Sequence, residues 1–178
     1  MKKIILAASV IAAFGAANAA QAASTGTITF NGELTATTCD VSVEGQGPDA
    51  TVVLPTLGTN VLNAPSKVAG ATRFNMALTN CAGTLKTASA YFEDGATVNA
   101  QGRLINSGTA TNVDLQLLDG SGTRGVINVG SGTQATTTTY VDVSTGSATL
   151  PYDVQYFATA PTTAGTVVSS VVYNLQYK

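Results

Sequence analysis

The sequence contains no histidine and no tryptophan, and only 10% of its 178 residues are charged. Without histidine, the chain has no Ser-His or Cys-His catalytic pair and no imidazole ligand for a metal. Apart from the adjacent Lys2 and Lys3, its six lysine and arginine residues are scattered, so they form no basic stripe that could follow a phosphate backbone. We therefore expect no nucleic-acid partner, no metal, no cofactor and no enzymatic activity.

Long apolar runs are also absent, apart from one near the N-terminus. Two lysines precede an apolar run over residues 4–14, and small residues with two Ala-x-Ala sites follow it. This order is typical of a secretory signal peptide, and the run is too short for a membrane-spanning helix, which needs about 20 apolar residues. Cleavage after Ala19 or after Ala22 fits the pattern. We prefer the second site, so that residues 1–22 are the removed leader.

Only two cysteines occur, Cys39 and Cys81. A leader directs them to an oxidising compartment, where an even number of cysteines favours a disulfide. The alternative, a reactive thiol, needs a basic neighbour to lower the thiol pKa, whereas Cys39 is followed by Asp40. We predict a structural bridge that joins two strands across the core.

Alternation of apolar and polar residues with a period of two runs through the chain after the leader. Helical periodicity is nearly absent, and turns rich in Gly, Ser and Pro separate the alternating segments. This pattern predicts a single all-β domain, a sandwich or a barrel. The expected strands cover residues 35–43, 51–57, 72–78, 86–92, 102–105, 113–118, 126–129, 136–143, 148–157 and 166–177.

Gly120–Gly125 matches the dinucleotide fingerprint G-x-G-x-x-G. That fingerprint acts by placing a pyrophosphate at a helix N-terminus, and here strand-like sequence follows it at residues 126–129. We interpret the segment as a hairpin turn.

The segment before the first cysteine alternates most regularly. Ile28, Phe30, Gly32 and Leu34 fall on one face, with Thr, Asn and Glu on the other. We interpret it as a straight strand that completes the sheet of a neighbouring copy. Because Asn-Gly between alternating segments is also a strong hairpin signal, the alternative is a local hairpin that pairs residues 27–30 with 33–38.

Several motifs along the chain together resemble one known family. They are the leader, the arm at residues 26–34, Cys39, Phe74-x-x-x-Leu78-x-x-Cys81, residues 110–113, Leu118-Asp119, residues 156–159 and the ending at residues 175–178. In this combination the chain resembles the structural pilins of chaperone–usher fimbriae, especially the type 1 fimbrial major subunit.

The resemblance implies an incomplete immunoglobulin-like sandwich that lacks its last strand, with an N-terminal donor-strand extension. Residues 23–34 would be the donor strand and residues 35–178 the pilin domain. A groove beside the C-terminal strand would be filled first by a periplasmic chaperone. At an outer-membrane usher, the arm of the next identical or homologous subunit would replace the chaperone. The product would be a fimbria on the bacterial cell surface that supports adhesion.

The resemblance also assigns roles to individual residues. The donor strand would insert Ile28, Phe30 and Leu34, with Gly32 as its small position, and Cys39 and Cys81 would form the disulfide. The strand that the chaperone pairs with would present Val171, Tyr173, Leu175 and Tyr177. Two alternatives remain open: a minor adaptor or tip pilin of the same system, and a secreted carbohydrate-binding β-sandwich.

Overall fold

The computed structural model of this chain describes residues 26–34, 36, 38–122 and 124–178. The predicted leader, residues 1–22, lies outside the described residues. The chain divides into two compact units, Met1–Glu33 and Leu34–Lys178, and every described strand lies in the second. Within the described ranges, no helix is long and apolar enough to cross a membrane.

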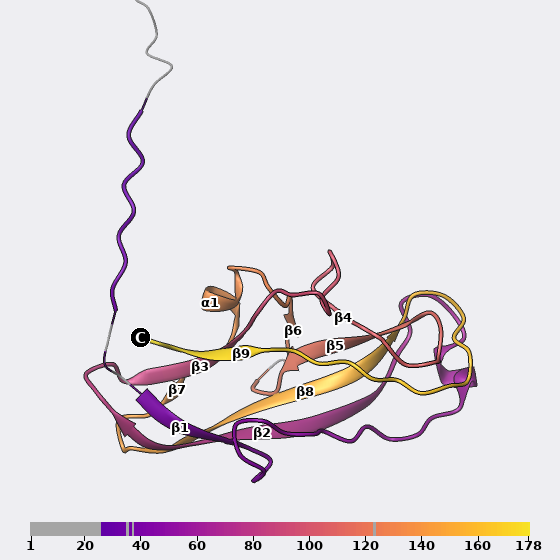
Figure 1. Ribbon diagram of the computed structural model, residues 1–178, viewed down its shortest axis with the longest axis horizontal. Helices are drawn as coiled ribbons and strands as arrows, with labels where there is room; N and C mark the ends of the chain where they lie inside the picture. The colour runs from indigo at the N-terminus through magenta and orange to yellow at the C-terminus, as the bar shows by residue number, and fades with distance from the viewer. Residues whose placement is uncertain (1–25, 35, 37, 123) are drawn as a thin grey trace, which may run out of the picture. The chain divides into compact units, whose positions relative to one another are not determined.

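Two antiparallel sheets build the second unit (Figure 1). The larger sheet has the order β1-β2-β8-β5-β4, with β6 paired to β5, and the smaller has the order β7-β3-β9. The strands of the larger sheet are β1 (Thr38–Val43), β2 (Val68–Ala82), β4 (Leu104–Ile105), β5 (Val113–Asp119), β6 (Val126–Ile127) and β8 (Ala148–Ala158). Those of the smaller sheet are β3 (Thr87–Phe92), β7 (Val141–Asp142) and β9 (Tyr173–Tyr177).

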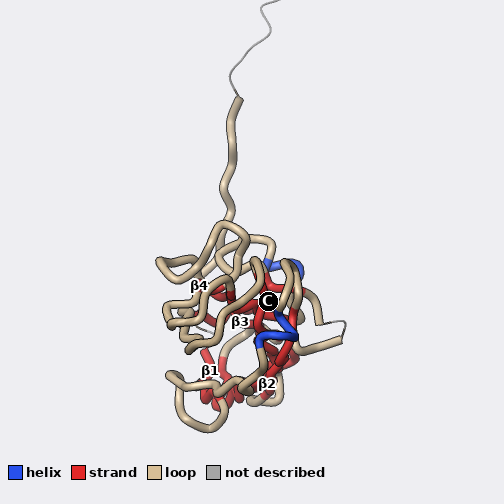
Figure 2. Tube along the Cα trace, turned by 90° about the vertical axis from the view of Figure 1, so that its right-hand side faces the viewer, coloured by secondary structure: helices blue, strands red, loops and turns tan. Residues whose placement is uncertain are grey.

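The core lies between the two sheets, with the strands inside and the loops around them (Figure 2). Alternation is clear in β2, where Phe74, Met76 and Leu78 are buried as the sequence pattern predicts, whereas β5 is buried at nearly every position. Tyr152 of β8 is 2% exposed, and its ring meets Phe92 of β3 edge-on at 5.0 Å between ring centres. Its hydroxyl accepts a hydrogen bond from the Ala90 N–H at 2.8 Å, so it satisfies a buried polar group of the facing sheet.

The predicted disulfide between Cys39 and Cys81 is present. It does not cross the core, however, and that part of the prediction is wrong. The bridge joins β1 to β2, which are neighbours in the same sheet, at a register shift between Thr38 and Asp40. It therefore fastens the edge strand of the larger sheet to the strand beside it.

The prediction of a strand at residues 136–143 is also wrong for residues 136 and 137. A short helix, α1 (Gln134–Thr137), takes this place, and only β7 is extended. Gln134 is fully buried because its amide pairs with both backbone groups of Phe92: the Phe92 N–H donates to Oε1 at 3.0 Å, and Nε2 donates to the Phe92 carbonyl at 2.9 Å. This long-range pairing overrides the local preference of Thr136 and Thr137 for extended backbone.

Candidate functional site: an unfilled strand position

Two long segments of the second unit are joined to each other by hydrogen bonds at both ends. They are the N-terminal wall, residues 48–62, which ends in the 3-10 helix η1 (Thr59–Leu62), and the C-terminal wall, residues 162–177, which ends in β9. At one end the Tyr173 hydroxyl donates to the Pro48 carbonyl at 2.8 Å. At the other, the Thr162 N–H donates to the Leu62 carbonyl at 3.1 Å. The two walls are thus antiparallel and joined at both ends.

One edge of the C-terminal wall is hydrogen-bonded and the other is open. The Thr166 and Val168 carbonyls accept the Ala110 and Ser107 N–H groups, at 3.0 Å and 2.8 Å. Val167, Ser169 and Val171 alternate with these residues, and among the described residues their backbone N–H and C=O groups have no hydrogen-bond partner. Backbone groups of successive residues point to opposite edges of an extended segment. The free groups of Val167, Ser169 and Val171 therefore point away from the edge that is bonded to Ser107 and Ala110.

The N-terminal wall is open in the same way. The predicted strand at residues 51–57 is extended but joins no sheet. Within the described part of the chain, the backbone groups of residues 52–54, 56 and 57 make no hydrogen bond, although Val52 and Leu54 pack against the core. The segment has the form of a strand whose neighbour is missing. Its Val52 and Leu54 side chains pack against the core, but its backbone forms no hydrogen-bond ladder with another described strand.

A groove with a volume of about 780 Å³ lies between β1, the start of the N-terminal wall and β9. All four residues predicted for the groove strand line it: Val171, Tyr173, Leu175 and Tyr177. The Cys39 N–H donates to the Tyr177 hydroxyl at 3.1 Å, so this tyrosine reaches across to β1. Burial raises the pKa of Tyr177 above its ordinary value, and burial together with the nearby Asp49 raises the pKa of Tyr173.

The arm itself, residues 26–34, forms no helix or strand. Its three large apolar side chains are almost fully exposed, with Ile28 at 78%, Phe30 at 88% and Leu34 at 102%. The alternative hairpin is not formed, since no ladder joins residues 27–30 to the described part of 33–38. Contiguous exposed apolar surface is typical of interaction sites.

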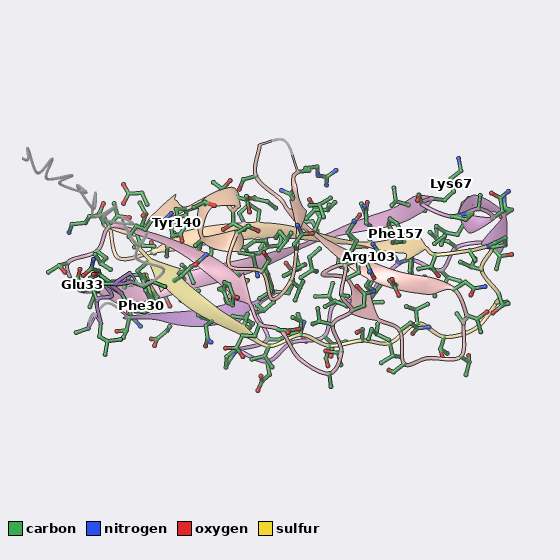
Figure 3. The ribbon with its side chains drawn as sticks, turned by 90° about the horizontal axis from the view of Figure 1, so that it is seen from above. Phe30, Glu33, Lys67, Arg103, Tyr140 and Phe157 are labelled. Atoms are coloured by element: carbon green, nitrogen blue, oxygen red, sulfur yellow. A yellow bond between two sulfur atoms is a disulfide. The ribbon has the colours of Figure 1, made fainter. Side chains whose placement is uncertain are left out.

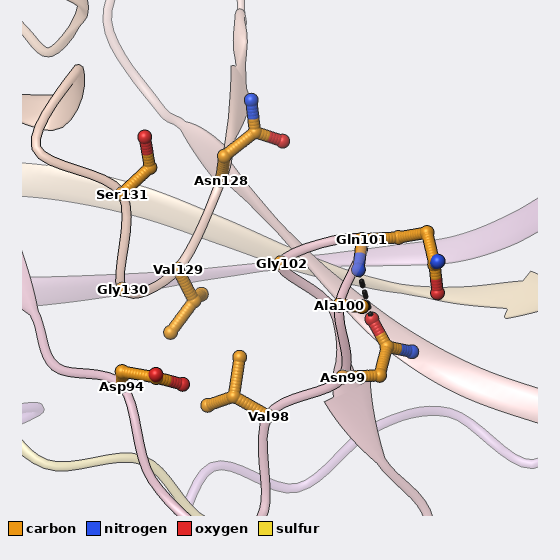
Figure 4. Close-up of a pocket in the computed structure, with 10 residues that line it drawn as sticks. All are labelled: Asp94, Val98, Asn99, Ala100, Gln101, Gly102, Asn128, Val129, Gly130 and Ser131. Carbon is orange, nitrogen blue, oxygen red and sulfur yellow. Dashed lines mark hydrogen bonds between the residues drawn. The ribbon is translucent and has the colours of Figure 1, made fainter.

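A second cavity, of about 580 Å³, lies between the loops at residues 94–102 and 128–131 (Figure 4). Val98 and Val129 face each other at its centre and the Asp94 side chain points toward the same space, while the side chains of Gln101 and Asn128 point away from it. Beside this region, the Arg103 guanidinium lies 4.1 Å from the centre of the Phe157 ring and binds Asp114 at 2.9 Å, which fastens the loop (Figure 3).

Sequence reasoning missed two parts of the groove. The open edge at residues 167–171 was expected to be part of one continuous strand, and Ser169 was not singled out. The period-two pattern contains Ser169 on the same face as Val167 and Val171, so the residue was visible as a polar interruption. Which edge of a strand lacks a partner is not encoded locally, because pairing depends on segments far apart in the chain.

Two sheets around a single core, with two facing edges left unpaired, define an incomplete immunoglobulin-like β-sandwich. This class of domain has room for one further strand in the groove. The comparisons with known proteins give the family. Residues 54–178 match the family described as type-1 fimbrial protein, A. The chain therefore belongs to the type-1 fimbrial protein family and is a structural subunit of a fimbria on the bacterial cell surface.

Individual relatives agree with this assignment. The chain is 46% identical over 169 residues to the major fimbrial subunit SMF-1 of Stenotrophomonas maltophilia, which covers 91% of this chain and 95% of that protein. It is 36% identical over 185 residues to the F17 fimbrial protein of Escherichia coli, with full coverage of both. Among solved structures, the P pilus rod subunit PapA shares the fold, with a TM-score of 0.57 at 19% identity, covering 79% of this chain and 99% of that one.

Proposed function

We propose that the chain polymerises by strand donation: the arm of one copy, residues 23–34, fills the groove of the next. The observation that carries this proposal is the pair of open backbone edges in the groove, together with an arm whose apolar face is exposed. Residues 26–34 extend over roughly 30 Å at about 3.3 Å per residue. The open edge and β9 together, residues 167–177, extend over roughly 36 Å, so the arm fits within the groove.

The energetics favour a long-lived joint. Burial of Ile28, Phe30 and Leu34 contributes about 1.5–3 kcal/mol for each side chain. Each ladder hydrogen bond that the arm forms with the open edges adds about 0.5–1.5 kcal/mol. Each copy donates an arm at one end and receives one at the other, so the contacts are head-to-tail and generate an open filament.

The same groove makes the free subunit vulnerable. An unpaired strand edge beside exposed core side chains is a template for non-specific association. A temporary occupant is therefore required between export and assembly, and the family resemblance supplies it as a periplasmic chaperone that hands the subunit to an outer-membrane usher. The predicted leader at residues 1–22 fits this route, and the role we propose is structural, without catalysis.

Within the fimbria we assign the chain to the shaft, because SMF-1, the relative with 46% identity, is named a major subunit. A minor adaptor or tip subunit would be rare in the fibre. Mass spectrometry of sheared fibres separates the two roles, since a shaft subunit is the bulk component. A trace amount of this chain would assign it to the minor role.

The test of strand donation is the substitution Phe30→Asp. A carboxylate at this position would have to be buried in an apolar groove, so we expect no fibres in electron micrographs of surface-sheared material, while the exported subunit still accumulates. Asn31→Asp is the matched control, because it adds the same charge to the other face of the arm and should leave fibres intact.

Normal fibres from Phe30→Asp would contradict strand donation. So would a processed chain without residues 23–34 that is monomeric and as stable as the complete chain. That second result would instead favour a self-sufficient carbohydrate-binding β-sandwich.

A further inference from the structure

Asn31-Gly32 is the one Asn-Gly pair in the sequence, and it lies within the arm. Both residues are exposed, and among the described residues neither has a hydrogen-bond partner. A Cβ built on Gly32 would meet nothing within 4 Å, so the space around this residue is open. Because glycine has no side chain to shield its backbone nitrogen, the Asn31 amide group and the Gly32 nitrogen form a reactive pair.

The reaction of such a pair is deamidation. The Gly32 backbone nitrogen attacks Cγ of Asn31 and forms a new N–Cγ bond. The Cγ–Nδ2 bond breaks, and Nδ2 leaves as ammonia with the proton of the Gly32 N–H, so that a five-membered succinimide ring remains. Water then opens the ring at one of its two carbonyls. Hydrolysis at Cγ gives aspartate in an ordinary backbone, whereas hydrolysis at the Asn31 main-chain carbonyl gives isoaspartate, in which the backbone runs through Cβ and Cγ.

We infer that Asn31 is a modification site: it deamidates while the subunit is unassembled, and insertion of the arm into a neighbouring copy stops the reaction. This inference rests on the proposed strand donation. Ring closure requires rotation about the Asn31 Cα–C bond until the Gly32 nitrogen faces Cγ. A strand that is hydrogen-bonded to a sheet edge holds this bond in the extended conformation, so the residue reacts only when the ladder opens.

The two products have different consequences for assembly. Aspartate adds a charge to the face of the arm opposite Phe30 and leaves the backbone unchanged. Isoaspartate adds one carbon atom to the main chain between Phe30 and Leu34. These two side chains then lose the spacing that places both of them on one face of a strand. An arm with isoaspartate should therefore fail to donate, so an unassembled subunit remains competent for a limited time.

Asn106 supplies an internal comparison in the folded domain, because it also precedes a small residue, Ser107. Its Oδ1 accepts hydrogen bonds from the Gly108 and Val168 N–H groups, both at 2.8 Å, and its Nδ2 donates to the Ala110 carbonyl at 2.8 Å. These bonds hold the amide group in place and keep it from the following nitrogen. We expect Asn106 to remain unmodified where Asn31 reacts.

The first experiment compares wild-type fibres with Phe30→Asp, the variant that strand donation predicts to remain unassembled. Both are incubated at neutral pH and then digested with a protease that cleaves after glutamate. From either leader cleavage site, the digestion releases an arm peptide that ends at Glu33 and contains Asn31 as its single asparagine. We expect the deamidated fraction of this peptide, measured by mass spectrometry, to increase at least about tenfold faster in the unassembled chain.

The second experiment measures the consequence for donation. Three synthetic peptides of residues 23–34 carry asparagine, aspartate or isoaspartate at position 31. Each is titrated into Phe30→Asp, whose groove has no competent arm to fill it. We expect the asparagine and aspartate peptides to have dissociation constants within about threefold of each other, and the isoaspartate peptide to bind at least about tenfold more weakly.

Three results would overturn the inference. They are equal deamidation rates in fibres and in the unassembled chain, modification of Asn106 as fast as that of Asn31 in Phe30→Asp, and equal binding of the three peptides. Strand donation is decided separately. It fails if Phe30→Asp forms fibres or if the unmodified peptide does not bind, whereas a binding peptide with a stable Asn31 overturns only the modification site.

Discussion

Asp153 on β8 is the one carboxylate that the described structure buries completely between two cations. Its Oδ1 binds Arg73 Nε at 3.1 Å, and its Oδ2 binds Arg124 Nε at 2.9 Å. The Arg73 Nη2 also donates to Oδ2 and to the Gly120 carbonyl. The two ion pairs cover the outer face of the larger sheet and fasten the turn after β5 to it.

We expect Asp153→Asn to destabilise the fold by about 2–3 kcal/mol. Breaking a fully buried ion pair typically costs about 3–5 kcal/mol. The two arginine side chains here are 43% and 50% exposed, so water compensates part of the loss, and the expected cost falls slightly below that range. In urea, where stability falls by about 1–3 kcal/mol per molar, the unfolding midpoint should decrease by roughly 0.7–3 M.

The effect should depend on pH. Burial acts to raise the pKa of Asp153, but hydrogen bonds from Arg73 and Arg124 outweigh it and hold the pKa below its ordinary value of 3.8. The stability contributed by the carboxylate is therefore fully present above pH 3.8 and is lost as the pH falls through the lowered folded-state value. The difference between wild type and Asp153→Asn should shrink in that acidic range.

Urea unfolding followed by far-UV circular dichroism measures this difference, with the wild type and the variant at matched concentration. Asp142→Asn is the control, since it removes an equal charge from an exposed strand end and should shift the midpoint far less. An unfolding midpoint for Asp153→Asn that equals that of the wild type would refute the claim that the buried carboxylate stabilises the fold.

Two further predictions concern the core and the edge strand. Replacing Cys39 and Cys81 with alanine opens a covalent loop with a sequence separation of 42, and we expect a loss of about 4 kcal/mol on the chain-entropy model, seen as an earlier thermal transition. A loss below about 1 kcal/mol would mean that the unfolded chain is not constrained by the bridge. Tyr152→Phe leaves the Ala90 N–H buried without its acceptor, so we expect a loss of about 1–3 kcal/mol in thermal unfolding. An unchanged transition would show that another group accepts this bond.

Most strands were predictable because their signal is local. β2, β3, β5 and β8 all carry a clear alternation of apolar and polar residues, and all appear at or near the expected positions. The disulfide followed from the number of cysteines and the predicted leader. The prediction was wrong where a distant contact decides the conformation, as with Gln134, whose amide binds the backbone of Phe92 and draws residues 134–137 into a helix.

The groove was predictable only in part. Its four residues on the C-terminal strand follow from the alternation and from the family resemblance, and the structure places all four along the cavity. The sequence does not show that the backbone of residues 51–57 and 167–171 lacks a neighbouring strand, since both segments have ordinary strand patterns. A segment becomes an unpaired edge only through the absence of a neighbour, and neighbours are set by the whole topology.

By itself, the sequence determined which residues alternate, which two cysteines can pair, and that the N-terminal arm has one apolar face, because each of these is a property of adjacent residues. The tertiary structure alone decided which edges remain without a partner, where a hydroxyl and a carboxylate are buried, and that the cysteines link neighbouring strands of one sheet. The physical reason is that hydrogen-bond ladders and burial are made between segments distant in the chain. No local pattern records which backbone groups will still be unpaired after the chain has folded.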